Sequence, residues 1–76
     1  MKDSRRNRLE AASKLISQAI AIIKEIGDEE QDLLANLPQG LKDGERGDAI
    51  EATIEALNDT VSHLEEALDG TTDALF

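Results

Sequence analysis

Asn36-Leu37-Pro38-Gln39-Gly40 is the stretch that decides the fold, because it separates two long segments that are each patterned as one helix. Proline disfavours helical geometry at the residue before it, and glycine tolerates backbone conformations that other residues resist. On both sides of this break, apolar residues recur at alternating intervals of three and four, which is typical of helices that pack side by side. The sequence therefore predicts an all-α, antiparallel helical hairpin.

The two apolar stripes define the expected helices, and only Glu30 is out of place in them. Their members are Leu9, Ala12, Ile16, Ala19, Ile23, Ile26, Leu33 and Leu37 in the first half, and Ile50, Ile54, Leu57, Val61, Leu64 and Leu68 in the second. Gly70 predicts the end of the second helix. The single domain of residues 1–76 is expected to contain a first helix over about 4–35, a turn over 36–43, a second helix over about 44–68 and a tail over 69–76.

The composition indicates self-assembly. Two helices bury little surface, and a chain of 76 residues without cysteine has neither disulfides nor thiolate metal sites to stabilise it. Apolar residues beside the first stripe also make that face wider than one partner helix covers. We expect a homodimeric four-helix bundle, with a higher oligomer left open. The residues expected at the subunit interface are Leu15, Ala19, Ile22, Ile26 and Leu34.

The charge is uneven along the chain. Residues 1–24 hold six basic and two acidic groups, whereas residues 25–76 hold two basic and fifteen acidic groups, for a net charge of −9. Such a chain repels nucleic acid over most of its surface, so direct nucleic-acid binding is not expected, although mimicry of nucleic acid is an alternative. A hairpin places the basic residues Arg5, Arg6 and Arg8 beside the acidic end of the second helix, where they pair with it or grip an acidic partner.

Two further sets are candidate binding residues. Arg46-Gly47 at the start of the second helix, with Asn36 and Gln39 near the turn, resembles a site for a carboxylate or phosphate, because free amides and a guanidinium point the same way there. The competing interpretation is that Gly47 serves packing and Arg46 pairs with a carboxylate. On the second helix, Glu51, Glu55 and Asp59 form an acidic face suited to a basic protein surface.

No catalytic set accompanies these residues, and no enzyme activity is expected. The acidic run from Asp43 fails as a calcium loop, because Asp48 stands where the loop needs glycine and Ile54 stands where it needs glutamate. No metal or cofactor is expected. No run of about 18 apolar residues could span a membrane, and no secretory signal is visible, so we expect a cytoplasmic protein.

Three short runs of residues before and after the break between the helices give the chain one resemblance to known proteins. The runs Asp28-Glu29-Glu30-Gln31-Asp32, Asn36-Leu37-Pro38 and Glu45-Arg46-Gly47, followed by heptads of Ile, Leu and acidic residues, resemble a group of short acidic helical proteins encoded in bacteriophages and prophages. The likeness covers roughly residues 5–70. It implies an accessory protein of viral origin, located in the host cytoplasm, and it implies no functional residues.

Three function classes follow. The first is a counter-defence or host-takeover protein that sequesters a small anionic ligand, such as a nucleotide signal, or blocks a host protein. The second is a structural coiled-coil adaptor or assembly protein, which requires an exposed apolar patch. The third is the acidic nucleic-acid mimic. The adaptor interpretation places that patch at Leu34, Leu37, Leu41 and Phe76.

Overall fold

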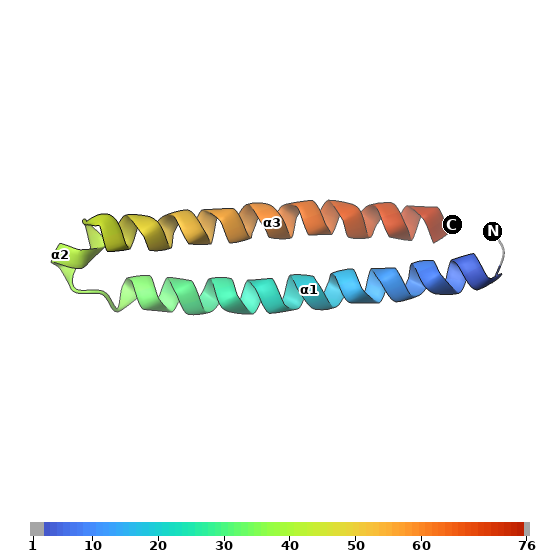
Figure 1. Cartoon of the computed structure of the whole chain (residues 1–76), viewed down its shortest axis with the longest axis horizontal. Coiled ribbons are helices and arrows are strands. Elements are labelled where there is room, and N and C mark those ends of the chain that lie inside the picture. Colours follow the sequence, from blue (N-terminus) through green and yellow to red (C-terminus); the bar gives the residue numbers. More distant parts are fainter. Residues whose placement is uncertain (1–2, 76) are drawn as a thin grey trace.

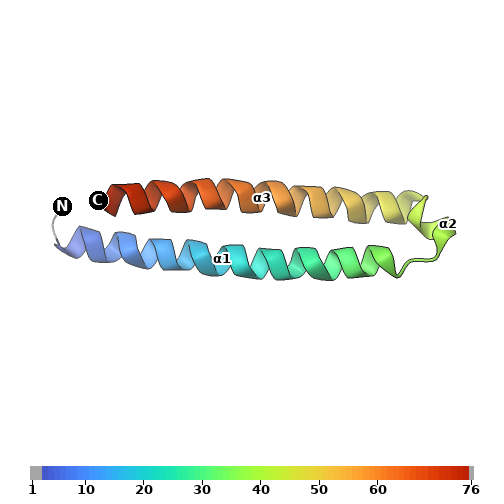
Figure 2. The same ribbon diagram turned by 180° about the vertical axis from the view of Figure 1, so that it is seen from behind.

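The chain forms an antiparallel helical hairpin, as the sequence predicts (Figure 1). The computed structural model describes residues 3–75. Within that range the elements are α1 (Asp3–Ala35), α2 (Gln39–Lys42) and α3 (Glu45–Leu75), with no strand. The two long helices lie side by side along their whole length, and the view from behind shows no further layer (Figure 2). The beginning of α1 and the end of α3 therefore meet at the pole opposite the turn.

The hairpin is a thin rod. Its Cα extents are 59 × 14 × 13 Å and its radius of gyration is 17.3 Å, against about 11 Å for a compact domain of this length. The accessible surface is 5566 Å², whereas a compact monomer of 8.2 kDa exposes about 4500 Å². The hairpin thus leaves about 1000 Å² more surface in water than a compact fold of the same mass.

The turn contains a short helix that the sequence analysis missed. Pro38, with φ −56° and ψ 149°, accepts hydrogen bonds at its carbonyl from the amides of Leu41 (2.9 Å) and Lys42 (3.0 Å), which starts the single turn of α2. No residue from 3 to 75 has a positive φ, so the reversal does not use a left-handed glycine. Leu37, just before α2, is half-buried, whereas Leu41, within α2, is exposed.

Gly47 lets α3 pack tightly against the turn. It is buried, and a Cβ at this position would overlap the carbonyl oxygen of Lys42 and lie 2.6 Å from its carbonyl carbon. Only glycine permits such an approach of two backbone segments. The packing interpretation of Gly47 is therefore the one that the structure supports.

The predicted stripe of α3 faces α1 as expected. Ile50 and Val61 are buried, and the other four predicted members are half-buried. The expected end of this helix is wrong, because α3 continues through Gly70 to Leu75 and most of the predicted tail is helical. A glycine inside a helix costs only about 1 kcal/mol, and Thr71 and Leu75 continue the inner stripe beyond it. Phe76 lies outside the described residues.

The stripe predicted for the first half of the chain is confirmed in part. Six of its members are half-buried, namely Leu9, Ala12, Ile16, Ala19, Ile23 and Leu37. Ile26 and Leu33 are 41% and 44% exposed, although their heptad positions predict burial. The inner stripe of α1 also includes Ile20, which is buried. In place of Ile26 and Leu33 it includes the residues that directly follow them, the buried Gly27 and the half-buried Leu34. Glu30, which the predicted pattern excluded, is half-buried as well. Glu30 is therefore part of the seam with α3.

Polar contacts hold the end of the hairpin opposite the turn. The hydroxyl of Ser13 donates to Oγ1 of Thr71 over 2.7 Å, and Thr71 in turn donates to the carbonyl of Leu68 over 2.9 Å. Further out, Nη1 of Arg6 donates to the carbonyl of Leu75 over 2.7 Å. These bonds fix the register in which the two long helices pass each other.

Replacing the buried glycines Gly27 and Gly47 should have opposite effects on stability. Gly27→Ala should raise the free energy of unfolding by about 1 kcal/mol, because a Cβ there meets nothing within 4 Å and alanine favours helix. Gly47→Ala should lower it by at least about 1 kcal/mol, because the turn must move away from the new methyl group. Urea unfolding at one fixed protein concentration measures both. Equal effects of the two substitutions would contradict the assigned role of Gly47.

Candidate binding surfaces

The residues predicted to hold an anion at the turn do not come together. Gln39 donates from Nε2 to Oδ2 of Asp43 over 3.2 Å, so its amide is engaged within the turn. Gly47 is covered by the main chain of Lys42. Arg46 and Asn36 are both exposed, and neither lines any of the hollows described below. These four residues therefore do not form the convergent set of donors that an anion site requires.

An open groove lies on one face of the hairpin beside the turn. It has a volume of about 630 Å³ and runs between α1 and α3. Of the four residues predicted to hold an anion, only Gln39 lines this groove. Its carboxylates outnumber its one cation, which favours a cationic occupant over an anionic one. The polar lining residues are Gln31, Gln39, Lys42, Asp43, Glu51, Glu55 and Asn58.

Two smaller hollows lie further from the turn. The first, of about 330 Å³, continues the same face and has Lys24, Asp28 and Ser62 among its lining residues. The second, of about 360 Å³, lies at the N-terminal end of α1 beside Arg5 and Arg8. Among residues 3–75, no group of His, Asp or Glu side chains could hold a metal ion.

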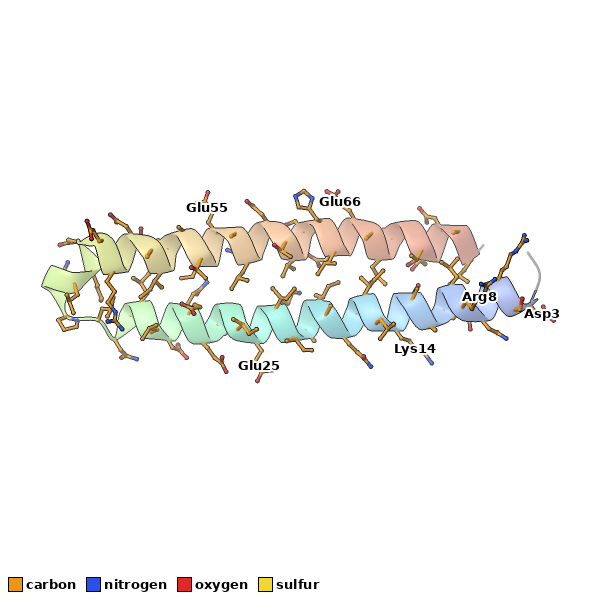
Figure 3. All side chains as sticks on the ribbon, in the orientation of Figure 1. Asp3, Arg8, Lys14, Glu25, Glu55 and Glu66 are labelled. Atoms are coloured by element: carbon orange, nitrogen blue, oxygen red, sulfur yellow. The ribbon has the colours of Figure 1, made fainter. Side chains whose placement is uncertain are left out.

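An acidic ridge follows the outer side of α3. The predicted residues Glu51, Glu55 and Asp59 belong to it, and Glu55 and Glu66 point away from α1 (Figure 3). All of its members are exposed, and none forms an ion pair with any residue from 3 to 75. Carboxylates one turn apart on a helix repel each other, so the ridge lowers stability rather than adding to it. The ridge comprises Asp48, Glu51, Glu55, Asp59, Glu66, Asp69 and Asp73.

The basic cluster at the start of α1 lies beside the end of α3, as the hairpin requires (Figure 1). The predicted pairing with acidic groups of α3 is not found within the described range. Arg6 pairs instead with Glu10 of its own helix, with Nε 3.6 Å from Oε1, and reaches only a main-chain carbonyl of α3. Arg8 bonds the carbonyl of Ser4 over 3.4 Å, and Arg5 is exposed.

Apolar side chains of α1 remain in water. Leu15 and Ile22 are 65% and 57% exposed, and Ile26 and Leu33 share their side of the helix. Ala19, also predicted at a subunit interface, is half-buried on the same side. Leu34, the fifth predicted interface residue, lies beside Ile54 in the groove wall and belongs to the seam instead. We call Leu15, Ala19, Ile22, Ile26 and Leu33 the apolar stripe.

The four residues expected to form the apolar patch of an adaptor differ in their exposure. Leu34 and Leu37 are half-buried, Leu41 is exposed, and Phe76 lies outside the described residues. The larger exposed apolar area lies along α1. None of the helices described is both long enough and apolar enough to cross a membrane.

Comparison with protein-family models, with curated proteins and with solved structures finds no match to this chain. The surfaces must therefore be interpreted from their own residues. Sequence reasoning missed the groove, although polar residues at helical spacing beside each apolar stripe, such as Lys24, Asp28 and Gln31, mark its face. It also missed most of the acidic ridge, whose three-and-four spacing is equally visible in the sequence.

The uncompensated ridge predicts an unusual salt response. The melting temperature should rise as sodium chloride increases from about 0.01 M to about 1 M, because the Debye length falls from about 30 Å to about 3 Å and repulsion along α3 is screened. The variant Glu51→Lys/Glu55→Lys/Asp59→Lys should show a smaller rise. Circular dichroism melts check both proteins. A wild-type melting temperature that stays flat or falls with salt would show that the ridge does not strain the fold.

Proposed function

We propose that this chain is a non-catalytic binding protein that works as a homodimeric four-helix bundle and blocks a basic surface of another protein. The observation that carries the proposal is the acidic ridge, which lies on the outer side of α3 with its carboxylates exposed and unpaired within residues 3–75. The ridge holds charges of one sign along most of the length of α3. Long arrays of one charge speed encounter with an oppositely charged surface.

The small core of the hairpin supports the proposed bundle. In the described part of the hairpin only Ile20, Ile50 and Val61 are buried hydrophobic side chains, and none of them is completely shielded from water. Such a core is too small to stabilise a chain of this length alone. Covering the apolar stripe of α1 with a second copy removes the exposed side chains and leaves the ridge facing outward.

The resemblance to bacteriophage accessory proteins implies that this activity takes place in an infected host cell. The blocked partner is then a host protein, and the outcome is counter-defence or host takeover. Sequestration of an anionic ligand is less well supported, because Arg46, Gly47, Asn36 and Gln39 do not converge. An acidic nucleic-acid mimic uses the same ridge, and its target is then a nucleic-acid-binding protein.

Charge reversal tests the proposal. A partner captured from a bacterial extract is identified, purified and titrated by calorimetry against three forms of the dimer. Glu51→Lys/Glu55→Lys/Asp59→Lys should weaken the dissociation constant at least about 100-fold, because three attractive charges become repulsive. The matched control Glu25→Lys/Asp28→Lys/Asp32→Lys changes the charge equally on α1 and should have less than about a tenth of that effect.

The contrary outcome is equally defined. Binding that survives reversal of the ridge but is lost in Arg46→Ala would reject the blocker and support a ligand site at the turn. Equal losses in both triple variants would show that net charge alone, and not the ridge, governs binding.

A further inference from the structure

The apolar stripe of α1 shares one face of the hairpin with a stripe of small residues on α3. The grooves show which flanks lie together, because Lys24 and Gln31 of α1 line the same hollow as Asn58 and Ser62 of α3. At 100° per residue, the apolar stripe and the pair Lys24 and Gln31 lie on opposite sides of the α1 residues that contact α3. In the same way, the small residues and the pair Asn58 and Ser62 lie on opposite sides of the α3 residues that contact α1. Both stripes therefore occupy the face of the hairpin away from the grooves.

The small-residue stripe is suited to burial. Its members are exposed in the hairpin, and they recur at intervals of three, four and seven along α3. The hydroxyl of Thr53 donates to the carbonyl of Ala49 over 3.0 Å, and that of Thr60 to the carbonyl of Ala56 over 2.8 Å. Because both hydroxyls are satisfied within the helix, the stripe can be covered without leaving a buried donor unpaired. The stripe comprises Ala49, Thr53, Ala56, Thr60, Ala67 and Ala74.

We infer that a second copy of this chain covers this face, with α1 of each copy packed on α3 of the other and both turns at the same end of the bundle. The inference rests on the dimer in the proposed function and adds its geometry. The Ser13–Thr71 bond sets the levels within each hairpin. A two-fold axis along the bundle keeps those levels, so Leu33 of one copy lies at the level between Ala49 and Thr53 of the other. In the same way, Ile26 lies at the level between Ala56 and Thr60.

Size complementarity favours this pairing. Leu33 and Ile26 meet shallow parts of the small-residue stripe, so the helices of both copies stay at similar distances there. His63 lies at the edge of this stripe between Thr60 and Ala67, at the level of Ile22. The other two-fold arrangement, with the turns at opposite ends, packs α1 on α1 and α3 on α3. It sets large side chains against large ones and small against small, which gives one wide and one narrow contact.

Weaker charge repulsion favours the same pairing. Residues 45–75 hold nine acidic groups and one arginine, whereas residues 3–35 hold seven acidic groups and five basic ones. Packing α3 on α3 would bring the two most acidic helices into contact. Packing α1 on α3 of the other copy keeps the two acidic helices diagonal, and their ridges face outward on opposite sides.

The area is that of a stable interface. The Cα extents of 59 × 14 Å correspond to a face of about 800 Å², close to the ~800 Å² per partner that specific complexes bury. It also accounts for most of the surface that the hairpin exposes beyond a compact monomer.

A distance between two spin labels tests the geometry. The chain has no cysteine, and a Cβ at Gly40 beside the turn meets nothing within 4 Å, so Gly40→Cys carries a nitroxide without disturbing the fold. Pulsed electron resonance on the labelled dimer should give a separation on the order of 20 Å, the diagonal of a four-helix bundle with two label arms. A separation near the 59 Å length of the hairpin would overturn the inference and leave the dimer intact. A monomer at every concentration in sedimentation would overturn the dimer itself.

A matched pair of substitutions tests the contact. Ala56→Leu fills the small-residue stripe and should raise the dimer dissociation constant at least about tenfold, because each dimer receives two oversized side chains. Ala21→Leu makes the same change on an exposed part of α1 outside the face and should leave the constant within about threefold. Sedimentation and dilution circular dichroism measure both. Equal constants for the two variants would overturn the inference.

Discussion

The seam between α1 and α3 is one layer of side chains deep, and the rest of the molecule is arranged around that limit. A helix that packs against a single neighbour covers only part of its circumference. Each long helix therefore keeps most of its surface for other uses. On α3 this surface divides into a ridge of carboxylates and a stripe of small residues, and on α1 it includes a stripe of large apolar side chains that its own partner does not reach.

Much of this arrangement is readable from the sequence, and the errors have physical causes. The α3 stripe is predicted correctly because only one set of residues on that helix is both large and apolar. On α1 two apolar stripes overlap, and period alone does not say which one faces α3. The prediction merges them, and so it places Ile26 and Leu33 inward where Gly27 and Leu34 lie. Gly70 indicates a stop, but its cost is smaller than the gain from seating Leu75.

The surfaces at the turn are harder to predict, because they depend on how two helices pass each other. Gly47 has the sequence context of an anion site, yet its backbone is in contact with Lys42. That contact depends on the short helix α2, for which no periodic signal exists in four residues. The groove likewise joins Gln31 to Asn58, and a sequence without a known register cannot place those two side chains opposite each other.

The meeting of Asp3 and Leu75 at one pole has a mechanical consequence (Figure 1). A force applied between these two ends loads the helices as a zipper and not in shear. The bonds of Arg6 and Ser13 to α3 would carry the load first, and the layers of the seam would then separate in succession toward the turn. Such a rod yields at low force when its ends are pulled apart, whereas a pull between one end and the turn stretches a single helix along its own axis and leaves the seam unloaded.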